Sequence, residues 1–199
     1  MPHIWDAEVG RPGCLVTLRR TNYIHEVDDP MPTLSMRPVH EDELDYFDQL
    51  ATAEADPFNF FGFKTGRRLR ADFADNGLVS EVAGTLFVVA DTQVIGDVGW
   101  HAQPYGPPGA GAAMNIGIRL LPEHRCHGYG GPAQRLLADY LLASYPINRV
   151  EASTDIENNA EQRALVKAGF SRDGVLRGAQ WRAGSWHDLV VFSRLRSDD

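Results

Sequence analysis

Apolar and polar residues follow two periods along this chain, one of about 3.6 residues and one of about two. Residues 132–144 carry apolar side chains at helical spacing and predict a helix with one apolar face. Residues 158–168 predict a second helix, which Gly169 ends, because glycine readily adopts the conformation that closes helices. Similar patterns predict helices at 41–53 and 65–75. Short runs rich in β-branched and aromatic residues predict strands at 34–38, 85–90, 94–101, 114–120, 149–154, 170–176 and 188–195.

The order of these elements predicts one mixed α/β domain. The first strand is followed by two helices and a three-stranded antiparallel meander, and then by alternating helices and strands that end in a hairpin. Residues 33–197 are expected to form this domain, with a loop rich in glycine, proline and alanine at 103–113. Residues 1–32 are punctuated by glycines and prolines and are predicted to form an N-terminal arm.

The charge balance limits the kinds of molecule that this protein is expected to bind. The chain has 27 acidic and 19 basic residues, a net charge of −8 and an isoelectric point near 5.3. Such a surface repels phosphate backbones, so we expect no nucleic-acid partner, whereas a cationic partner is compatible. Cys14 and Cys126 form no CxxC pair, and no metal site is expected. No apolar run approaches the ~20 residues of a membrane span, and the N-terminus lacks a signal-peptide pattern, so we expect a cytoplasmic protein without membrane contacts.

A glycine-rich loop precedes the helix predicted at 132–144. Gly128 and Gly130 allow the backbone to fold tightly and to approach a ligand closely. Free N–H groups at a helix start bind anions together with the helix dipole, and Arg125 adds a positive charge suited to phosphate. The loop therefore predicts a cradle for a pyrophosphate, and a simple turn without a ligand is the alternative.

The spacing Gly128-x-Gly130-x-x-Ala133, with Glu151 further on, also matches the dinucleotide-binding fingerprint. That fingerprint belongs to a doubly wound parallel sheet, which needs several strand–helix units after the loop. Too little chain follows here, and the preceding strands predict an antiparallel meander. A nicotinamide-dependent oxidoreductase is therefore the weakest of the functions that the sequence allows.

Two blocks of the sequence resemble motifs of the GNAT superfamily of acyl-CoA-dependent N-acyltransferases. Residues 125–130, Arg-x-x-Gly-x-Gly, are similar to that family's Gln/Arg-x-x-Gly-x-Gly/Ala motif for acyl-CoA. Residues 158–170 resemble its Asn-x-Ala-Ser-x-Arg-x-Leu-x-Lys-x-Gly-Phe segment at the same spacing. Residues 178–195, which include Trp186-His-Asp188, are similar to the closing hairpin of the RimJ/RimL-like branch. Because two blocks occur in order, the resemblance is specific, and it covers roughly residues 34–196.

The resemblance implies an α/β GNAT fold, with a mixed, mostly antiparallel sheet, splayed central strands and flanking helices. It implies acetyl-CoA as the co-substrate, without a metal, and a pantetheine arm that passes between strands 114–120 and 149–154. Backbone groups near Leu120 would hold this arm and donate to the oxyanion, and Asn158 would bind it as well as cap its own helix. The pyrophosphate would bind the loop, whose candidate residues are Arg125, His127, Gly128, Tyr129, Gly130 and Gly131.

The chain departs from the family pattern where other members carry catalytic groups. Asn115 stands where many members have a carboxylate on the fourth strand, Leu165 where some have a tyrosine acid, and Glu161 where others have a serine. An amine must lose a proton before it attacks a thioester. The base candidates are Asp97 and His101 on the preceding strand, with Glu161 as a third, although each also has a purely structural interpretation.

Aromatic residues give less information about the acceptor. The segment 58–63 contains four phenylalanines and lies where the family builds its acceptor site from the first two helices. Burial in the core is the commoner fate of such side chains, and Trp100, Trp181 and Trp186 are expected in the core on the same ground.

The expected function is the transfer of an acetyl group from acetyl-CoA to a primary amine in a ternary complex. The acceptor would be a protein N-terminus or a small-molecule amine, and the RimJ/RimL resemblance favours the protein N-terminus. The missing carboxylate and tyrosine also fit a non-catalytic module that senses acyl-CoA. A homodimer through the tail strands or the N-terminal arm is compatible with the sequence.

Overall fold

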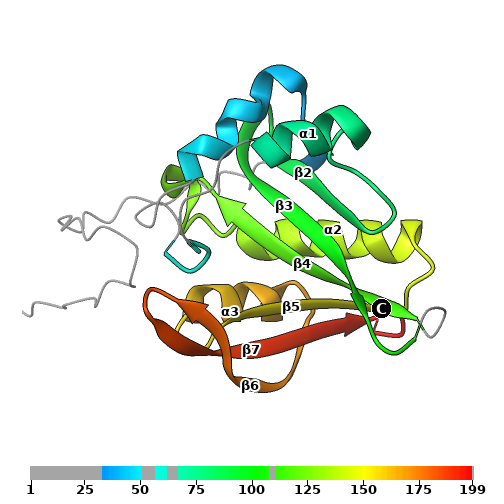
Figure 1. The fold of residues 1–199 in the computed structure, drawn as a ribbon, viewed down its shortest axis with the longest axis vertical. Coiled ribbons are helices and arrows are strands. Elements are labelled where there is room, and N and C mark those ends of the chain that lie inside the picture. The colour runs from blue at the N-terminus through cyan, green and yellow to red at the C-terminus, as the bar shows by residue number, and fades with distance from the viewer. Residues whose placement is uncertain (1–32, 51–56, 62–66, 108–110, 199) are drawn as a thin grey trace, which may run out of the picture. The chain divides into compact units, whose positions relative to one another are not determined.

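The computed structural model describes residues 33–50, 57–61, 67–107 and 111–198, so the arm predicted for residues 1–32 lies outside the described part. Within that part, seven strands form one sheet in the order β1-β2-β3-β4-β5-β7-β6 (Figure 1). Neighbouring strands are antiparallel except for the central pair of β4 and β5, which is parallel. The strands are β1 (Leu34–Pro38), β2 (Ala83–Ala90), β3 (Gln93–Pro104), β4 (Ala112–Leu120), β5 (Arg149–Asp155), β6 (Ser171–Arg182) and β7 (Ser185–Leu195).

Four helices of the described part occur where the apolar periodicity predicts them, one of them with a change of type, and the short helix η2 was not predicted. The predicted helix at 41–53 is the 3-10 helix η1 (Glu41–Leu50), and residues 51–56 are not described. Its two buried side chains, Leu44 and Phe47, are three residues apart, which matches the three-residue turn of a 3-10 helix. The other helices are α1 (Arg67–Asn76), η2 (Pro122–His124), α2 (Gly130–Ser144) and α3 (Asn159–Lys167).

Every strand except β1 extends beyond its predicted range, most of all β3, β6 and β7. β3 and β4 continue to Pro104 and from Ala112, into the predicted loop at 103–113, because the two strands pair with each other there. β6 runs to Arg182, since its second half pairs with the start of β7 across the turn at Ala183 and Gly184. In each case strand pairing extends the element beyond its apolar run.

The side chains of the sheet divide into two cores. Alternate residues of the strands face α2 and α3 and form the main core, which includes Val98, Ile116 and Val150. The opposite face carries a smaller cluster around Phe87, which η1 and α1 cover (Figure 1). Helices α2 and α3 therefore lie on one side of the sheet, and η1 and α1 lie on the other.

An ion pair fixes the start of η1 to β1. Arg37 donates to the two carboxylate oxygens of Glu43 at 2.6 and 2.7 Å, and the N–H of His40 donates to the same carboxylate at 3.0 Å. The hydrogen bonds from Arg37 lower the pKa of Glu43 to about 2. Glu43 is therefore ionised at neutral pH and holds the first turn of η1 on the sheet.

Candidate active site at the split between β4 and β5

The two central strands separate after a short paired stretch. β4 and β5 pair over three residues of each strand, ending at Ile116 and Ala152, and then diverge (Figure 1). Leu121 N–H donates to Ile95 O at 3.0 Å, and bonded pairs alternate along an antiparallel ladder. Leu120, the preceding residue, therefore turns its N–H and C=O away from β3 and into the gap. The predicted split between the central strands is confirmed, and one side of it presents free backbone groups.

The glycine loop after β4 has the conformation of an anion site. Cys126 and Gly128 have positive φ angles of 64° and 86°, and Tyr129 returns to the right-handed helical region. The first backbone bond into the helix is from Ala133 N–H to Tyr129 O at 3.0 Å. Within the described residues, the N–H groups from His127 to Gly131 have no acceptor, and Tyr129 makes no side-chain cap. Such alternating conformations gather N–H groups into a concave site at the positive end of α2.

Arg125 connects this loop to the end of β4. Its Nε donates to Leu120 O at 3.0 Å, so the carbonyl of Leu120 is occupied while the N–H of Leu120 still points into the gap. This bond holds the guanidinium beside the loop, where its remaining N–H groups are available to an anion.

The glycines at the start of α2 have different roles. Gly128 is exposed and left-handed, which suits the approach of a ligand. Gly131 is buried, and a Cβ added there would lie 3.1 Å from Lys167 Cβ and 3.2 Å from Ala164 O. A Cβ added at Gly130 would meet Ala164 Cβ at 3.4 Å, an ordinary contact. The absent side chain of Gly131 therefore allows α2 to pack on α3, a packing role beside the N–H group that it offers to the loop.

Asn158 is the N-cap of α3. Its Oδ1 accepts a hydrogen bond from Glu161 N–H at 3.2 Å, which leaves Nδ2 as the group that a ligand could use. Glu161 lies in the first turn of α3, where its charge also suits the helix dipole. Leu165, where some family members carry a tyrosine, is fully buried in the main core.

Asp97 lies beneath η1 in an ion pair. It is 4% exposed, and Arg119, its partner in the β3–β4 register, donates to it at 2.9 and 3.2 Å. The guanidinium also lies over the ring of Phe47, 5.5 Å from its centroid. Burial, together with the charge of Asp97, raises the pKa of the neighbouring Tyr46 hydroxyl. Asp97 is thus held on Arg119, an arrangement that serves the packing of η1.

His101 lies further along the same face of β3. It is exposed, and its partners in the register are Ala83 and Asn115. His101 follows Asp97 by four positions, which is roughly 13 Å along a strand, in the direction away from the glycine loop. The structure does not bring His101 together with the loop, with Asn158 or with Glu161.

A polar cluster that the sequence analysis missed lies at the end of β5. Asp155 accepts from Arg182 and faces His187 Nδ1 at 2.8 Å, and both Asp155 and Arg182 are at most 6% exposed. Arg182 also donates to Phe58 O at 2.8 Å, so it links the β6–β7 hairpin to the segment 57–61. The sequence signal was present only as the Trp186-His-Asp188 resemblance, because nothing in the spacing places Asp155 beside that hairpin.

The tryptophans divide between core and surface. Trp100 is buried in the main core, as expected. Trp181 and Trp186 are 56% and 66% exposed, and their rings meet edge to face at 5.4 Å on the β6–β7 hairpin, so the expectation of core burial was wrong for both. The two indoles occupy paired positions, Trp181 opposite Trp186, close to the hairpin turn. Phe61 is likewise 46% exposed, whereas Phe63 of the same phenylalanine-rich segment lies outside the described residues.

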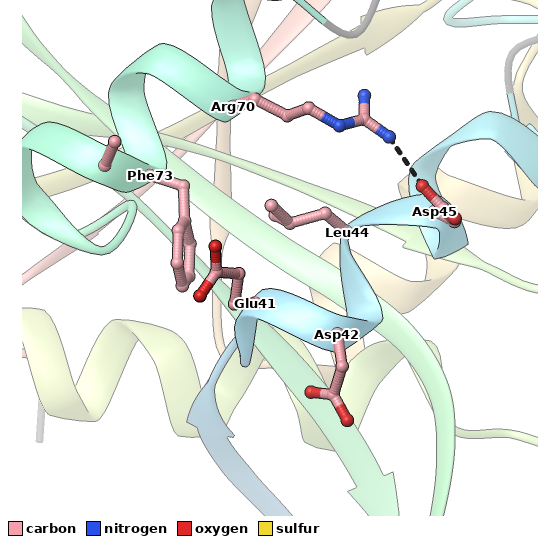
Figure 2. Close-up of a pocket in the computed structure, with 7 residues that line it drawn as sticks. Glu41, Asp42, Leu44, Asp45, Arg70 and Phe73 are labelled. Atoms are coloured by element: carbon pink, nitrogen blue, oxygen red, sulfur yellow. Dashed lines mark hydrogen bonds and ion pairs between the residues drawn. The ribbon is translucent and has the colours of Figure 1, made fainter.

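A pocket of about 530 Å³ lies between η1 and α1. Figure 2 shows Leu44 and Phe73 at its apolar part and the ion pair of Asp45 with Arg70 at its rim. Glu41 and Asp42 add two further carboxylates. None of its lining residues belongs to the glycine loop, β4 or β5, so the pocket is separate from the split between the strands.

Two kinds of feature are absent from the described residues. No group of three or more His, Cys, Asp and Glu side chains there could hold a metal ion. No helix in the same ranges is both long and apolar enough to cross a membrane.

Comparison with known proteins decides the family. Residues 33–171 match the family model described as the acetyltransferase (GNAT) domain. The chain belongs to the GNAT acetyltransferase family. Probable N-acetyltransferase YjcK of Bacillus subtilis is 28% identical over 184 residues, which cover 90% of this chain and 97% of YjcK. Uncharacterized N-acetyltransferase YoaA of the same species is 30% identical over 101 residues, and this match spans 51% of the chain and 55% of YoaA.

Solved structures agree with this GNAT fold. Spermidine N-acetyltransferase from Vibrio cholerae, solved with CoA and spermine, has a TM-score of 0.71 at 17% identity and covers 83% of this chain and 96% of its own. RimL, the ribosomal L7/L12 α-N-protein acetyltransferase solved with coenzyme A, has a TM-score of 0.69 at 17% identity, with 84% and 96% covered. The predicted fold class and family are therefore confirmed, and the chain is a GNAT-family N-acetyltransferase.

Proposed function

We propose that this GNAT protein transfers the acetyl group of acetyl-CoA to a primary amine, by direct attack in a ternary complex. The observation that carries the proposal is the loop of unbonded N–H groups at the start of α2, beside a split in the sheet. Acetyl-CoA supplies the acyl group as a thioester. Arg125 and the N–H groups of residues 127–131 are suited to its pyrophosphate, since they combine a fixed cation with converging donors.

The gap between β4 and β5 suits the rest of the co-substrate. The N–H of Leu120 points into the gap and can donate to a pantetheine carbonyl or to the oxyanion that forms during attack. Asn158 Nδ2 lies at the start of α3, on the other side of the gap. On the face covered by η1, Gly117 has no atom within 4 Å of where a Cβ would lie, which leaves open space for an acceptor beside β4.

The acceptor is a cation in its resting form. Primary amines have pKa values near ~10, so most molecules are protonated at neutral pH and are attracted to a protein of charge −8. The amine must then release a proton before attack. Small-molecule amines and a protein N-terminus both fit this description, and the structural relatives include enzymes named for each. Of the base candidates from the sequence, Asp97 is committed to Arg119, whereas Glu161 and His101 remain available to test.

A non-catalytic acyl-CoA sensor is the second candidate. Asn115 on β4 and the buried Leu165 in α3 favour it, because neither side chain can act as an acid or a base. A sensor and an enzyme share the same CoA loop and differ in turnover.

The test of the CoA loop is isothermal titration with acetyl-CoA, CoA and NAD. We expect micromolar affinity for acetyl-CoA, no comparable affinity for NAD, and a loss of about 30-fold or more in Gly128→Glu, which places an anion among the phosphate-binding N–H groups. Gly77→Glu is the matched control, because Gly77 has a similar φ of 63° with open space around it and lies outside the loop. Equal affinity in Gly128→Glu and the wild type would show that the loop is only a turn.

Turnover separates the two candidate functions. Release of CoA thiol is followed with a panel of polyamines, amino acids, amino sugars and N-terminal peptides. Thiol release with at least one amine supports the enzyme, whereas tight acetyl-CoA binding without release for any amine supports the sensor.

A further inference from the structure

We propose that the hydrogen-bonded chain of Asp155, His187 and Ser185 accepts the proton of the acceptor amine, with His187 as the base. This proposal deepens the acetyltransferase function proposed above and rests on it. The chain links β5 to the turn of the β6–β7 hairpin, and it uses none of the base candidates that the sequence suggests.

The three side chains form a continuous line of hydrogen bonds. His187 Nδ1 lies 2.8 Å from Asp155 Oδ2, and His187 Nε2 lies 2.9 Å from Ser185 Oγ. The line runs from a buried carboxylate, through a ring whose side chain is 20% exposed, to an exposed hydroxyl. It therefore connects the interior of the fold to the surface at a single point, Ser185.

The carboxylate decides which ring nitrogen carries the hydrogen. An ionised carboxylate only accepts, so Asp155 requires a hydrogen on Nδ1 of His187. In the neutral ring this leaves the lone pair on Nε2, which faces the hydroxyl of Ser185. The second neighbour of Nε2 is Arg182 O at 3.2 Å, which can accept the hydrogen that Nε2 gains when the ring is protonated. Both protonation states of His187 therefore find partners in the same geometry.

The carboxylate that faces the imidazole is itself held by an ion pair. Arg182 and Asp155 form a buried ion pair that holds the carboxylate in place, and Arg182 NH2 lies 3.2 Å from His187 Nδ1. Asp188, the next residue of β7, is turned to the N–H of Gly178 at 2.7 Å and not to the imidazole. Asp155 is thus the carboxylate that faces the ring, and it acts as a positioning residue.

The hydrogen-bonded chain of Asp155, His187 and Ser185 lies at the split between the central strands. Because β4 and β5 are parallel, their C-terminal ends meet at one edge of the sheet, where the glycine loop also begins. Asp155 follows Ala152, the last residue of β5 that pairs with β4, by three residues, or roughly 10 Å. Ala152 faces the main core. The side chain of Asp155 lies on the opposite face of the sheet, which η1 covers.

The same cluster organises the surroundings of the split. Asp155 Oδ1 accepts from Glu157 N–H at 2.8 Å in the turn that leads to Asn158, and Arg182 donates to Phe58 O. The loop before α3, the β6–β7 hairpin and the segment 57–61 therefore share one buried anchor beside the gap (Figure 1). An acceptor that reaches the gap from this face passes the exposed end of the chain, Ser185.

The acceptor ammonium loses two protons when it becomes an amide. The ammonium gives one proton to Ser185 Oγ, whose own proton moves to His187 Nε2, and the lone pair left on nitrogen attacks the acyl carbon. A C–N bond forms and the C–S bond breaks. The second proton lost from nitrogen ends on the departing thiolate, and His187 returns the first to solvent.

The experiment measures kcat and KM against pH for the wild type and for His187→Gln, with the best amine from the panel. We expect the rate of the wild type to fall on the acid side with one apparent ionisation, as a histidine base requires. In His187→Gln, kcat at neutral pH should fall about 100-fold and the acid limb should give way to a steady rise with pH, since only the free amine then reacts. The affinity for acetyl-CoA should stay within about threefold.

Three controls make the result specific. His40→Gln removes an exposed histidine before η1 and should keep the wild-type profile. Ser185→Ala should lower kcat by about 10-fold and keep the acid limb, because water can replace the hydroxyl. If His187→Gln keeps the acid limb, or if His101→Gln or Glu161→Gln removes it instead, the proposal is wrong although the acetyltransferase stands. If the wild type transfers no acetyl group, both proposals fail.

Discussion

Asp97 loses nearly all contact with water on folding, and Arg119 is the charge that compensates for this loss. The carboxylate side chain is 6% exposed and the guanidinium 32% exposed, so the pair lies at the edge of the small core under η1. Removing one member of such a pair leaves the other without its partner in a poorly solvated place. When both residues are replaced, no charge is left without a partner. The stability losses of the two single substitutions should therefore be coupled.

We predict that Asp97→Ala lowers the free energy of unfolding by about 2 kcal/mol, less than for a fully buried pair because Arg119 is partly solvated. Arg119→Met should cost a similar amount. The double variant should be more stable than the sum of the single losses implies, by about 1 kcal/mol. Urea denaturation of the four proteins measures this, and strict additivity would contradict the coupling. Any loss of activity in Asp97→Ala must be corrected for this loss of stability.

At the scale of elements, the contact between α2 and α3 determines how the CoA loop is supported. Gly131 is buried against Ala164 and Lys167, while Gly130 is only half-buried and has more room. Since both glycines lie in the first turn of the same helix, they differ mainly in the distance to α3. The start of α2 can keep its N–H groups in place only if α3 stays packed beneath it.

We predict opposite results for two alanine substitutions in this turn. In Gly131→Ala the new Cβ would lie 3.1 Å from Lys167 Cβ and 3.2 Å from a backbone oxygen, so α2 and α3 must separate, at a net cost of about 1–2 kcal/mol. In Gly130→Ala the contact is ordinary, and the better helix propensity of alanine should leave stability unchanged or raised by about 0.5 kcal/mol. Thermal and urea unfolding compare the two, and an equal loss in both would exclude the packing explanation.

The elements also show what the sequence could and could not predict. Apolar periodicity located α2 and α3 and the strands of the meander, because these elements bury one regular face. It did not show the 3-10 character of η1, since Leu44 and Phe47 fit either helix type at a three-residue spacing. Nor did it show the full length of β6, whose second half is held by pairing with β7 and not by its own apolar residues.

Part of the candidate site could likewise be predicted from the sequence, and part of it could not. The glycine loop is local in the sequence, so its residues could be named in advance, and Asn158 could be named as a cap. The cluster of Asp155, Arg182 and His187 depends on the pairing of β5 with β7 and on the hairpin turn, and no local pattern brings these residues together. Residues that meet only through strand pairing cannot be grouped from the sequence, and only the structure shows that they lie together.

For the whole molecule, the charge sets the long-range interaction with both substrates. On the proposed function, the net charge of −8 attracts a cationic amine and repels the anionic co-substrate, so binding of acetyl-CoA would depend on local donors such as Arg125 and the loop N–H groups. The long-range contribution is screened by salt within about 10 Å at 0.1 M, whereas short contacts inside the loop are screened less. The two substrates should thus respond differently to ionic strength.

We predict that kcat/KM for a cationic amine falls about three- to tenfold between 25 and 400 mM NaCl, because screening removes its attraction to the acidic protein. Over the same range kcat/KM for acetyl-CoA should hold steady or rise. Steady-state kinetics with a polyamine measures both, and a weakly basic aromatic amine, which is uncharged at neutral pH, is the control. An equal fall for the charged and uncharged amines would show that salt acts on the enzyme or on the CoA loop, and that the acidic surface does not guide the acceptor.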